Sequence, residues 1–228
     1  MVICPLTSDE CSKKIIPSSK TAFIISPSTT NQPTNMPEVI KAIYRELKKA
    51  GFKPIEGASL VDYGDFVCSI CKSILSCPFG IAFAGKGVPD KTLCNIFWEI
   101  GLMQGFGKVV LLVADEALNL PSDFNRTFII LYNQINYVEK FRKSIQKLKD
   151  LPRYYMKVLA PIALDALDYE KAQKYYQDAY LFSANRRCLS ELEKIKKSIS
   201  GGKKSKQLDG MSARVTNQID AFIKGASI

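Results

Sequence analysis

The sequence predicts an α/β domain at residues 21–150, with a flavodoxin-like five-stranded parallel sheet in the order 2-1-3-4-5, followed by an all-helical extension. Three observations support this fold class. Short apolar runs alternate with stretches whose apolar residues recur at helical spacing. Two runs, 79–84 and 109–114, are apolar throughout, which is typical of parallel strands covered on both faces. Strict β-α alternation implies right-handed crossovers, for which this strand order is the simplest.

Turn and helix-end residues predict the boundaries of the elements. The run TAFIIS leads into turn-forming residues, so a strand is expected at 21–26. Pro37 suits the first position of a helix and Gly51 its carboxyl-terminal stop. The elements expected after it are a strand at 52–55, a helix at 66–76 ended by Pro78, a strand at 79–84, a helix at 93–105, a strand at 109–114, a strand at 127–132 and a helix at 137–148.

The regions outside this domain have a different character. Residues 1–20 form a polar lead, and residues 151–228 show only helical periodicity. Within the extension, GGKKSK at 201–206 is expected to be a flexible linker. The segment 211–223 predicts a short amphipathic helix that docks on this domain or on a partner. The extension is therefore the predicted surface for a homo-oligomer or a protein partner.

The charge distribution disfavours nucleic-acid binding by the α/β domain. Of the net charge of +10, little belongs to residues 21–115, which hold nine Lys and Arg against eight Asp and Glu; residues 116–228 hold twenty against twelve. The basic residues of the extension are scattered without interleaved aromatic residues. No apolar run approaches the roughly 20 residues that span a bilayer, and no apolar leader follows the start, so we expect a cytoplasmic protein without membrane contact.

The absence of histidine limits the available chemistry. It excludes Ser-His and Cys-His catalysis, and leaves proton transfer to carboxylate, Lys, Tyr or Cys. Cys68 and Cys71 have no second close pair of metal ligands, and no metal site is expected. They fall inside an apolar helical stretch, which indicates core packing. No G-x-G-x-x-G follows the first strand and no G-x-x-x-x-G-K-[ST] occurs, which disfavours hydride transfer and ATP hydrolysis.

Glu99 is the only charged residue in the almost wholly apolar helix at 93–105. It is expected in the second turn of this helix, near the carboxyl edge of the sheet, where such folds bind ligands. Apolar neighbours including Trp98 should raise its pKa, and Asn95 is placed to hold it by a hydrogen bond. Such a carboxylate suits stabilisation of an oxocarbenium-like centre. The alternative is a surface glutamate that points to water or pairs with a lysine such as Lys91.

Three predicted loops converge at the same edge. Their candidate substrate-binding residues are Ser26, Ser28, Thr29, Asp62, Asp65 and Gly85. The hydroxyls of the first loop suit phosphate or ribose, although such loops are also polar as ordinary turns. The two aspartates of the second loop suit ribose hydroxyls or the cap of the next helix. Trp98 suits stacking on a base or packing in the core.

The segment around Glu99 resembles a known family. The pattern N-x-x-x-E-[IL]-G, followed by a glycine, G-K and an apolar strand, is similar to bacterial TIR-like domains and the related nucleoside 2-deoxyribosyltransferases. The residues that carry it are Asn95, Glu99, Ile100, Gly101, Gly107, Lys108 and VVLLV. The likeness covers about 21–135, with FIISPST at the first strand and DYGDF after the second. In both families a glutamate at this place carries glycosidic-bond chemistry.

The TIR-like resemblance implies an NAD glycohydrolase or cyclase with a role in defence signalling. NAD is then the substrate, with no separate cofactor, and Glu99 contacts the nicotinamide ribose. A transferase would show an Asp-Ser/Gly-rich turn before the glutamate, where this chain has Asp90-Lys-Thr-Leu-Cys94, so the TIR-like interpretation leads. The alternatives are a nucleoside 2-deoxyribosyltransferase or nucleotide N-glycoside hydrolase, and a non-catalytic module that senses a nucleotide or binds partners.

Overall fold

The computed structural model describes residues 15–56, 66–120, 128–201 and 209–227. They divide into two compact units. The first contains residues 21–147, and the second contains residues 148–227 together with residues 15–20. Residues 15–20, the end of the predicted polar lead, belong to the helical unit. There the backbone N–H of Lys20 donates to the carbonyl of Leu181 at 2.7 Å.

The first unit is built on the predicted sheet. All strand pairs are parallel, and the order is β2-β1-β3-β4-β5, which confirms the predicted fold class. The strands are β1 (Thr21–Ile25), β2 (Lys53–Glu56), β3 (Phe79–Ala84), β4 (Val109–Ala114) and β5 (Phe128–Leu131). Every residue of β1 and β3 is buried, as expected for central strands covered on both faces.

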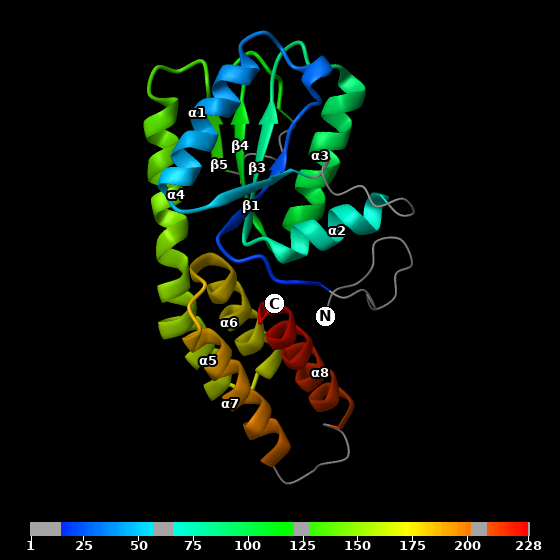
Figure 1. Ribbon diagram of the computed structural model, residues 1–228, viewed down its shortest axis with the longest axis vertical. Helices are drawn as coiled ribbons and strands as arrows, with labels where there is room; N and C mark the ends of the chain where they lie inside the picture. Colours follow the sequence, from blue (N-terminus) through cyan, green and yellow to red (C-terminus); the bar gives the residue numbers. More distant parts are fainter. Residues whose placement is uncertain (1–14, 57–65, 121–127, 202–208, 228) are drawn as a thin grey trace. The chain divides into compact units, whose positions relative to one another are not determined.

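Helices cover both faces of this sheet. They are α1 (Met36–Lys49), α2 (Phe66–Ser76), α3 (Asp90–Gly105) and the part of α4 (Tyr137–Tyr154) that belongs to this unit. Figure 1 shows α1 and α4 on one side of the sheet, and α2 and α3 on the other. Gly51 follows α1 with a φ of 86°, a left-handed conformation that favours glycine, as the predicted helix stop requires.

An ion pair with a buried carboxylate joins the two helices on one face. The Glu46 carboxylate of α1 is almost fully buried and accepts from Arg142 Nε of α4 at 2.5 Å and from Lys49 Nζ at 2.9 Å. Hydrogen bonds from Arg142, then Lys49, lower the pKa of Glu46 to about 2. The carboxylate is thus ionised at neutral pH, and its two oxygens bind both helices.

The first unit departs from the prediction in the connection between β4 and β5 and at the start of α3. The strict β-α alternation does not extend to the connection between β4 and β5, whose described part, residues 115–120, contains a turn and no helix. The Asp115 carboxylate accepts from the backbone N–H of Ala117 at 2.9 Å and so starts this turn directly after β4. Helix α3 begins at Asp90, three residues earlier than predicted, because the Pro89 carbonyl accepts from the N–H groups of Thr92 and Leu93.

The second unit is all-helical, as predicted. Helix α4 runs on through a π-helical turn, η4 (Tyr155–Leu159), into α5 (Ala160–Asp165), and is followed by α6 (Tyr169–Ser183), α7 (Arg187–Gly201) and α8 (Asp209–Ala226). The irregular turn comes after Pro152, which has no N–H to donate to the helix. The predicted linker lies almost entirely outside the described residues. No helix in the described part of the chain combines the length and the apolar character needed to span a membrane.

Candidate functional site

Two of the three predicted loops meet at the carboxyl edge of the sheet. Asn31, in the loop after β1, donates through Nδ2 to Oγ1 of Thr92 at 3.3 Å, in the first turn of α3. This contact brings the loop after β1 to the start of α3, next to the point where the strand order reverses between β1 and β3. Asp62 and Asp65, from the loop after β2, lie outside the described residues.

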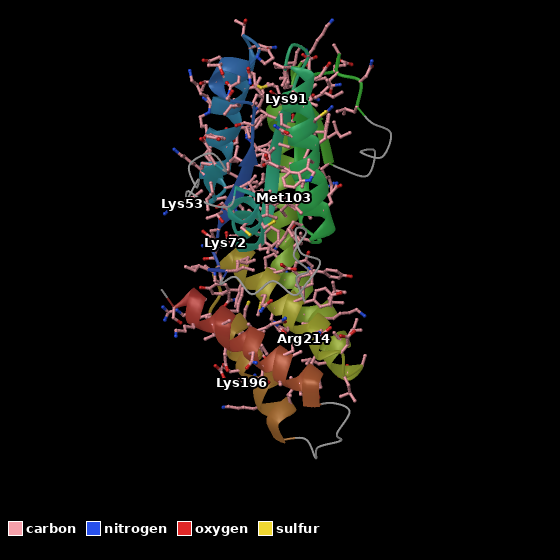
Figure 2. All side chains as sticks on the ribbon, turned by 90° about the vertical axis from the view of Figure 1, so that its right-hand side faces the viewer. Lys53, Lys72, Lys91, Met103, Lys196 and Arg214 are labelled. Carbon is pink, nitrogen blue, oxygen red and sulfur yellow. The ribbon has the colours of Figure 1, made fainter. Side chains whose placement is uncertain are left out.

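Glu99 lies on the flank of α3 that carries Thr92. Seven residues turn a helix by about 700°, so the two side chains leave α3 in nearly the same direction, about 10 Å apart along the axis. Thr92 contacts the loop after β1, and Glu99 leaves the helix in nearly the same direction, farther along its axis. Figure 2 shows Lys91 near one end of α3 and Met103 toward the other, and Glu99 falls between them in sequence.

Glu99 lies farther along α3 than predicted. Because α3 begins at Asp90, Glu99 is the tenth residue of the helix and lies in its third turn, not in its second. Its neighbours Ile96, Ile100 and Met103 are buried against the sheet. Met103 lies directly over Gly80 of β3, because a Cβ on that glycine would collide with the methionine sulfur. The carboxylate therefore lies beside the buried stripe of the helix.

The Glu99 carboxylate is half-buried and uncompensated. No hydrogen bond or ion pair to it is formed by the residues that the structure describes. Desolvation by burial raises its pKa from 4.5 to about 7, as predicted. A desolvated acid without a counter-charge costs stability, and such groups concentrate at functional sites. The alternative pairing with Lys91 is not found, since eight residues of helix separate the two by about 12 Å.

Neither predicted neighbour supports Glu99 as expected. Asn95 is exposed, and it forms no hydrogen bond with Glu99 in the structure. Trp98 is 45% exposed and lies away from the core, so the packing alternative for this residue is wrong. Adjacent residues on a helix point about 100° apart, and this carries Trp98 away from the flank that carries Glu99. Its stacking on a base stays a prediction.

The hydroxyl groups of the first loop are accessible but partly engaged. Ser28 and Thr29 are exposed, and Ser26 is half-buried directly after β1. The hydroxyl of Ser28 lies 3.1 Å from that of Thr30, within a short 3-10 turn. Gln32 Nε2 donates to the carbonyl of Pro27 at 2.9 Å, a hydrogen bond within the loop that stabilises its conformation. Polar contacts within the loop therefore engage part of its hydrogen-bonding groups.

Gly85, at the end of β3, has a packing reason to be glycine. A Cβ at this position would lie 2.6 Å from the Tyr132 hydroxyl and 2.8 Å from Cε of Met36. Protein atoms thus already occupy the space beside its backbone. The predicted contact of Gly85 with a substrate is not needed to explain this residue.

A buried polar group that the sequence did not predict lies at the same edge. The Tyr132 hydroxyl donates to Asp115 Oδ2 at 3.1 Å, and Asn35 hydrogen-bonds to Tyr132 in turn. Burial, followed by the bond to Asp115, raises the pKa of Tyr132. The signal available in the sequence was an aspartate immediately after the apolar run VVLLVA, at the edge where ligands bind. This group ties the ends of β4 and β5 to the start of α1.

Comparison of the chain with models of protein families finds no match, and comparison with curated proteins finds none either. Among the described residues, no group of three or more Cys, Asp and Glu side chains is arranged to hold a metal ion. Two features of the first unit remain as chemical candidates: the half-buried Glu99 carboxylate of α3, which no described residue compensates, and the hydroxyl groups of the loop after β1.

Proposed function

We propose that the α/β unit cleaves the bond between nicotinamide and ribose in NAD, as a TIR-like glycohydrolase or cyclase. The observation that carries the proposal is Glu99, a half-buried carboxylate of α3 with a pKa raised to about 7. The fold supports the placement of a nucleotide, since doubly wound sheets bind ligands beyond the carboxyl ends of their strands.

The chemistry needs one carboxylate and no histidine. The nicotinamide nitrogen of NAD is cationic, so it takes the electron pair of the breaking bond and leaves as a neutral amide without being protonated. The positive charge that develops at ribose C1′ is stabilised by the ionised carboxylate of Glu99. Water then adds to C1′ and loses a proton to give ADP-ribose. In a cyclase, a nitrogen of the adenine adds in place of water.

The raised pKa of Glu99 predicts how the proposed activity depends on pH. Only the ionised form of Glu99 stabilises a cation, and a pKa of about 7 leaves about half of it protonated at neutral pH. We therefore expect kcat/KM for NAD to rise with pH through about 7 and then to level off, since this parameter reports the free enzyme.

The test is incubation of the concentrated full chain with NAD and with deoxynucleosides, followed by mass spectrometry of the products. Glu99→Gln should keep the fold and reduce nicotinamide release about 10²–10³-fold, the usual loss when a group that stabilises the transition state is removed. The matched control is Glu38→Gln, an exposed glutamate of α1 paired with Lys41, which should behave as the parent does. Equal turnover of NAD by Glu99→Gln and the parent would end this proposal.

The same experiment separates the alternatives. Release of a base from deoxynucleosides, with NAD left intact, would assign the chain to the deoxyribosyltransferases or nucleotide N-glycoside hydrolases. Binding of NAD without any product would assign it to nucleotide sensing.

A further inference from the structure

The end of the N-terminal lead and the end of the last helix meet within the helical unit. Residues 15–20 and α8 both belong to this unit. Gly225 of α8 is buried, and a Cβ on it would lie 2.7 Å from Cδ of Pro17 and 3.5 Å from the carbonyl oxygen of Ile15. The lead therefore packs directly against the backbone of α8, at a position that leaves no space for a side chain.

Two consecutive residues of α6 bind both partners of this contact. The Tyr180 hydroxyl donates to the carbonyl of Ala226, the last residue of α8, at 3.2 Å. The Tyr180 ring also meets the ring of Phe222 of α8 edge-on, with 5.8 Å between the centroids. The carbonyl of Leu181 accepts from the backbone N–H of Lys20 at 2.7 Å. Helix α6 thus binds the last turn of α8 and the end of the lead at neighbouring positions.

Lys20 has a strained backbone conformation. Its φ is 54°, in the left-handed region, which is unfavourable for a residue with a Cβ. Residues remain in this region only where their surroundings hold them there. The hydrogen bond to Leu181 is one such restraint, and Lys20 is followed directly by Thr21, the first residue of β1. The lead therefore enters the central sheet through a residue that favours another conformation once it is released.

The interface between α6 and α8 includes a buried polar group with incomplete hydrogen bonding. Helix α8 packs on α6 and α7 through Val215 and Ile219 (Figure 1). Gln173 of α6 is 4% exposed, and its Nε2 donates to Oε1 of Gln218 of α8 at 3.3 Å. Oε1 of Gln173 has no hydrogen-bond partner among the residues that the structure describes. An unsatisfied buried acceptor costs stability, and water satisfies it when the helices separate. This group therefore favours separation of α8 from α6.

We propose that α8 is a releasable helix that holds the lead on the helical unit. When α8 separates from α6, the lead loses its packing surface at Gly225, and Lys20 leaves the left-handed region. The residues that enter β1 are then free, while α6 and α7 keep their packing on each other. The docking of α8 is in this way coupled to the start of the central strand. This coupling does not depend on the proposed cleavage of NAD.

Hydrogen exchange of the full chain, measured by NMR, tests whether α8 and the lead open together. The amides of Lys20, Ile219 and Tyr176 report on the lead, α8 and α6. In the parent, the protection factors of Lys20 and Ile219 should agree within about three-fold, and both should lie at least about ten-fold below that of Tyr176. Equal protection of Ile219 and Tyr176 would overturn the proposal, because α8 would then separate only when the whole helical unit unfolds.

Gly225→Ala tests the contact between α8 and the lead. The added methyl would crowd the rigid ring of Pro17, so the protection factor of Lys20 should fall about ten-fold while amides of β3 keep theirs. The matched control is Gly210→Ala, at an exposed position of the same helix with nothing within 4 Å, which should leave Lys20 as protected as in the parent. Unchanged protection of Lys20 in Gly225→Ala would overturn the proposal.

Gln173→Leu tests the coupling through the interface of α6 and α8. It removes the unsatisfied acceptor, so the protection factor of Ile219 should rise, and that of Lys20 should rise by the same factor. A change of protection at Ile219, in either direction, that leaves Lys20 unaltered would overturn the coupling.

Discussion

At the scale of single residues, Glu99 differs from the buried carboxylates of the α/β unit because no described residue compensates its charge. The buried Glu46 carboxylate is compensated by Arg142 and Lys49, and its pKa falls to about 2. The buried Asp115 carboxylate accepts hydrogen bonds from Ala117 and Tyr132. Glu99 has no such partner among the described residues, and its pKa rises to about 7. Local violations of this kind are expected where function, and not stability, has selected the side chain.

The first prediction is that Glu99→Gln stabilises the protein at pH 8 and has little effect at pH 5. In the unfolded chain the carboxyl loses its proton near pH 4.5, but in the folded state only near 7. The folded state therefore loses stability as pH rises from about 4.5 to about 7, and this loss persists above 7. An amide does not ionise, so we expect a gain of about 1–3 kcal/mol at pH 8, reduced from the full shift by partial exposure.

Urea unfolding of both proteins at the two pH values measures this difference. Glu38→Gln, at an exposed and paired position, provides the baseline for replacing a glutamate in this unit. A Glu99→Gln effect that is the same at pH 5 and at pH 8 would show that the carboxylate is solvated in the folded protein.

The sequence predicted the unusual residue of the site better than it predicted its surroundings. A lone acid in an apolar helix is visible in the chain, and its raised pKa followed from that composition. The exposure of Trp98 depends on the direction in which its side chain leaves α3. The amino-acid composition of the helix does not determine that direction. The bond between Tyr132 and Asp115 joins two strand ends 17 residues apart, and only the sheet pairing brings them together.

At the scale of elements, the apolar runs were the most reliable guide. The helix at 66–76 and the strands at 79–84 and 109–114 have the predicted bounds, because Pro78 and uninterrupted burial leave little freedom in them. Helix α4 continues to Tyr154, past its predicted end at 148, although it contains Pro152. A proline removes only one backbone donor, and the π-helical turn that follows accommodates that loss. The rule that a proline ends a helix therefore does not predict this continuation.

The second prediction concerns the end of β3, where three elements meet at Gly85. Gly85→Ala should destabilise the protein by about 1–3 kcal/mol, because its Cβ would crowd the Tyr132 hydroxyl at 2.6 Å and displace it from Asp115. Thermal unfolding measures the change. The control is Gly101→Ala on α3, where nothing lies within 4 Å and alanine should stabilise the helix by about 0.5–1 kcal/mol. Equal effects of the two substitutions would mean that the end of β3 is less tightly packed than the structure has it.

At the scale of the whole molecule, the chain contains two separately built cores. The core of the α/β unit is formed by the buried strands and by the helix faces that pack on them. The helical unit has its own cluster, centred on Tyr176, Leu192, Ile195 and Ile219 from α6, α7 and α8. The cluster of the helical unit draws all its residues from within that unit. We therefore expect the two units to differ in local stability and to open independently.

The third prediction is that Leu192→Ala weakens only the helical unit. Leu192 is fully buried in the core of that unit, so its truncation should cost about 2–5 kcal/mol there. Hydrogen exchange followed by mass spectrometry should show lost protection in peptides from residues 148–227, while peptides of β1, β3 and β4 keep theirs. The reciprocal variant, Leu111→Ala at a fully buried position of β4, should produce the opposite pattern. If Leu192→Ala lowered protection equally in β3 and β4, the two cores would unfold as one cooperative system, and changes in the extension would then reach Glu99 through global stability.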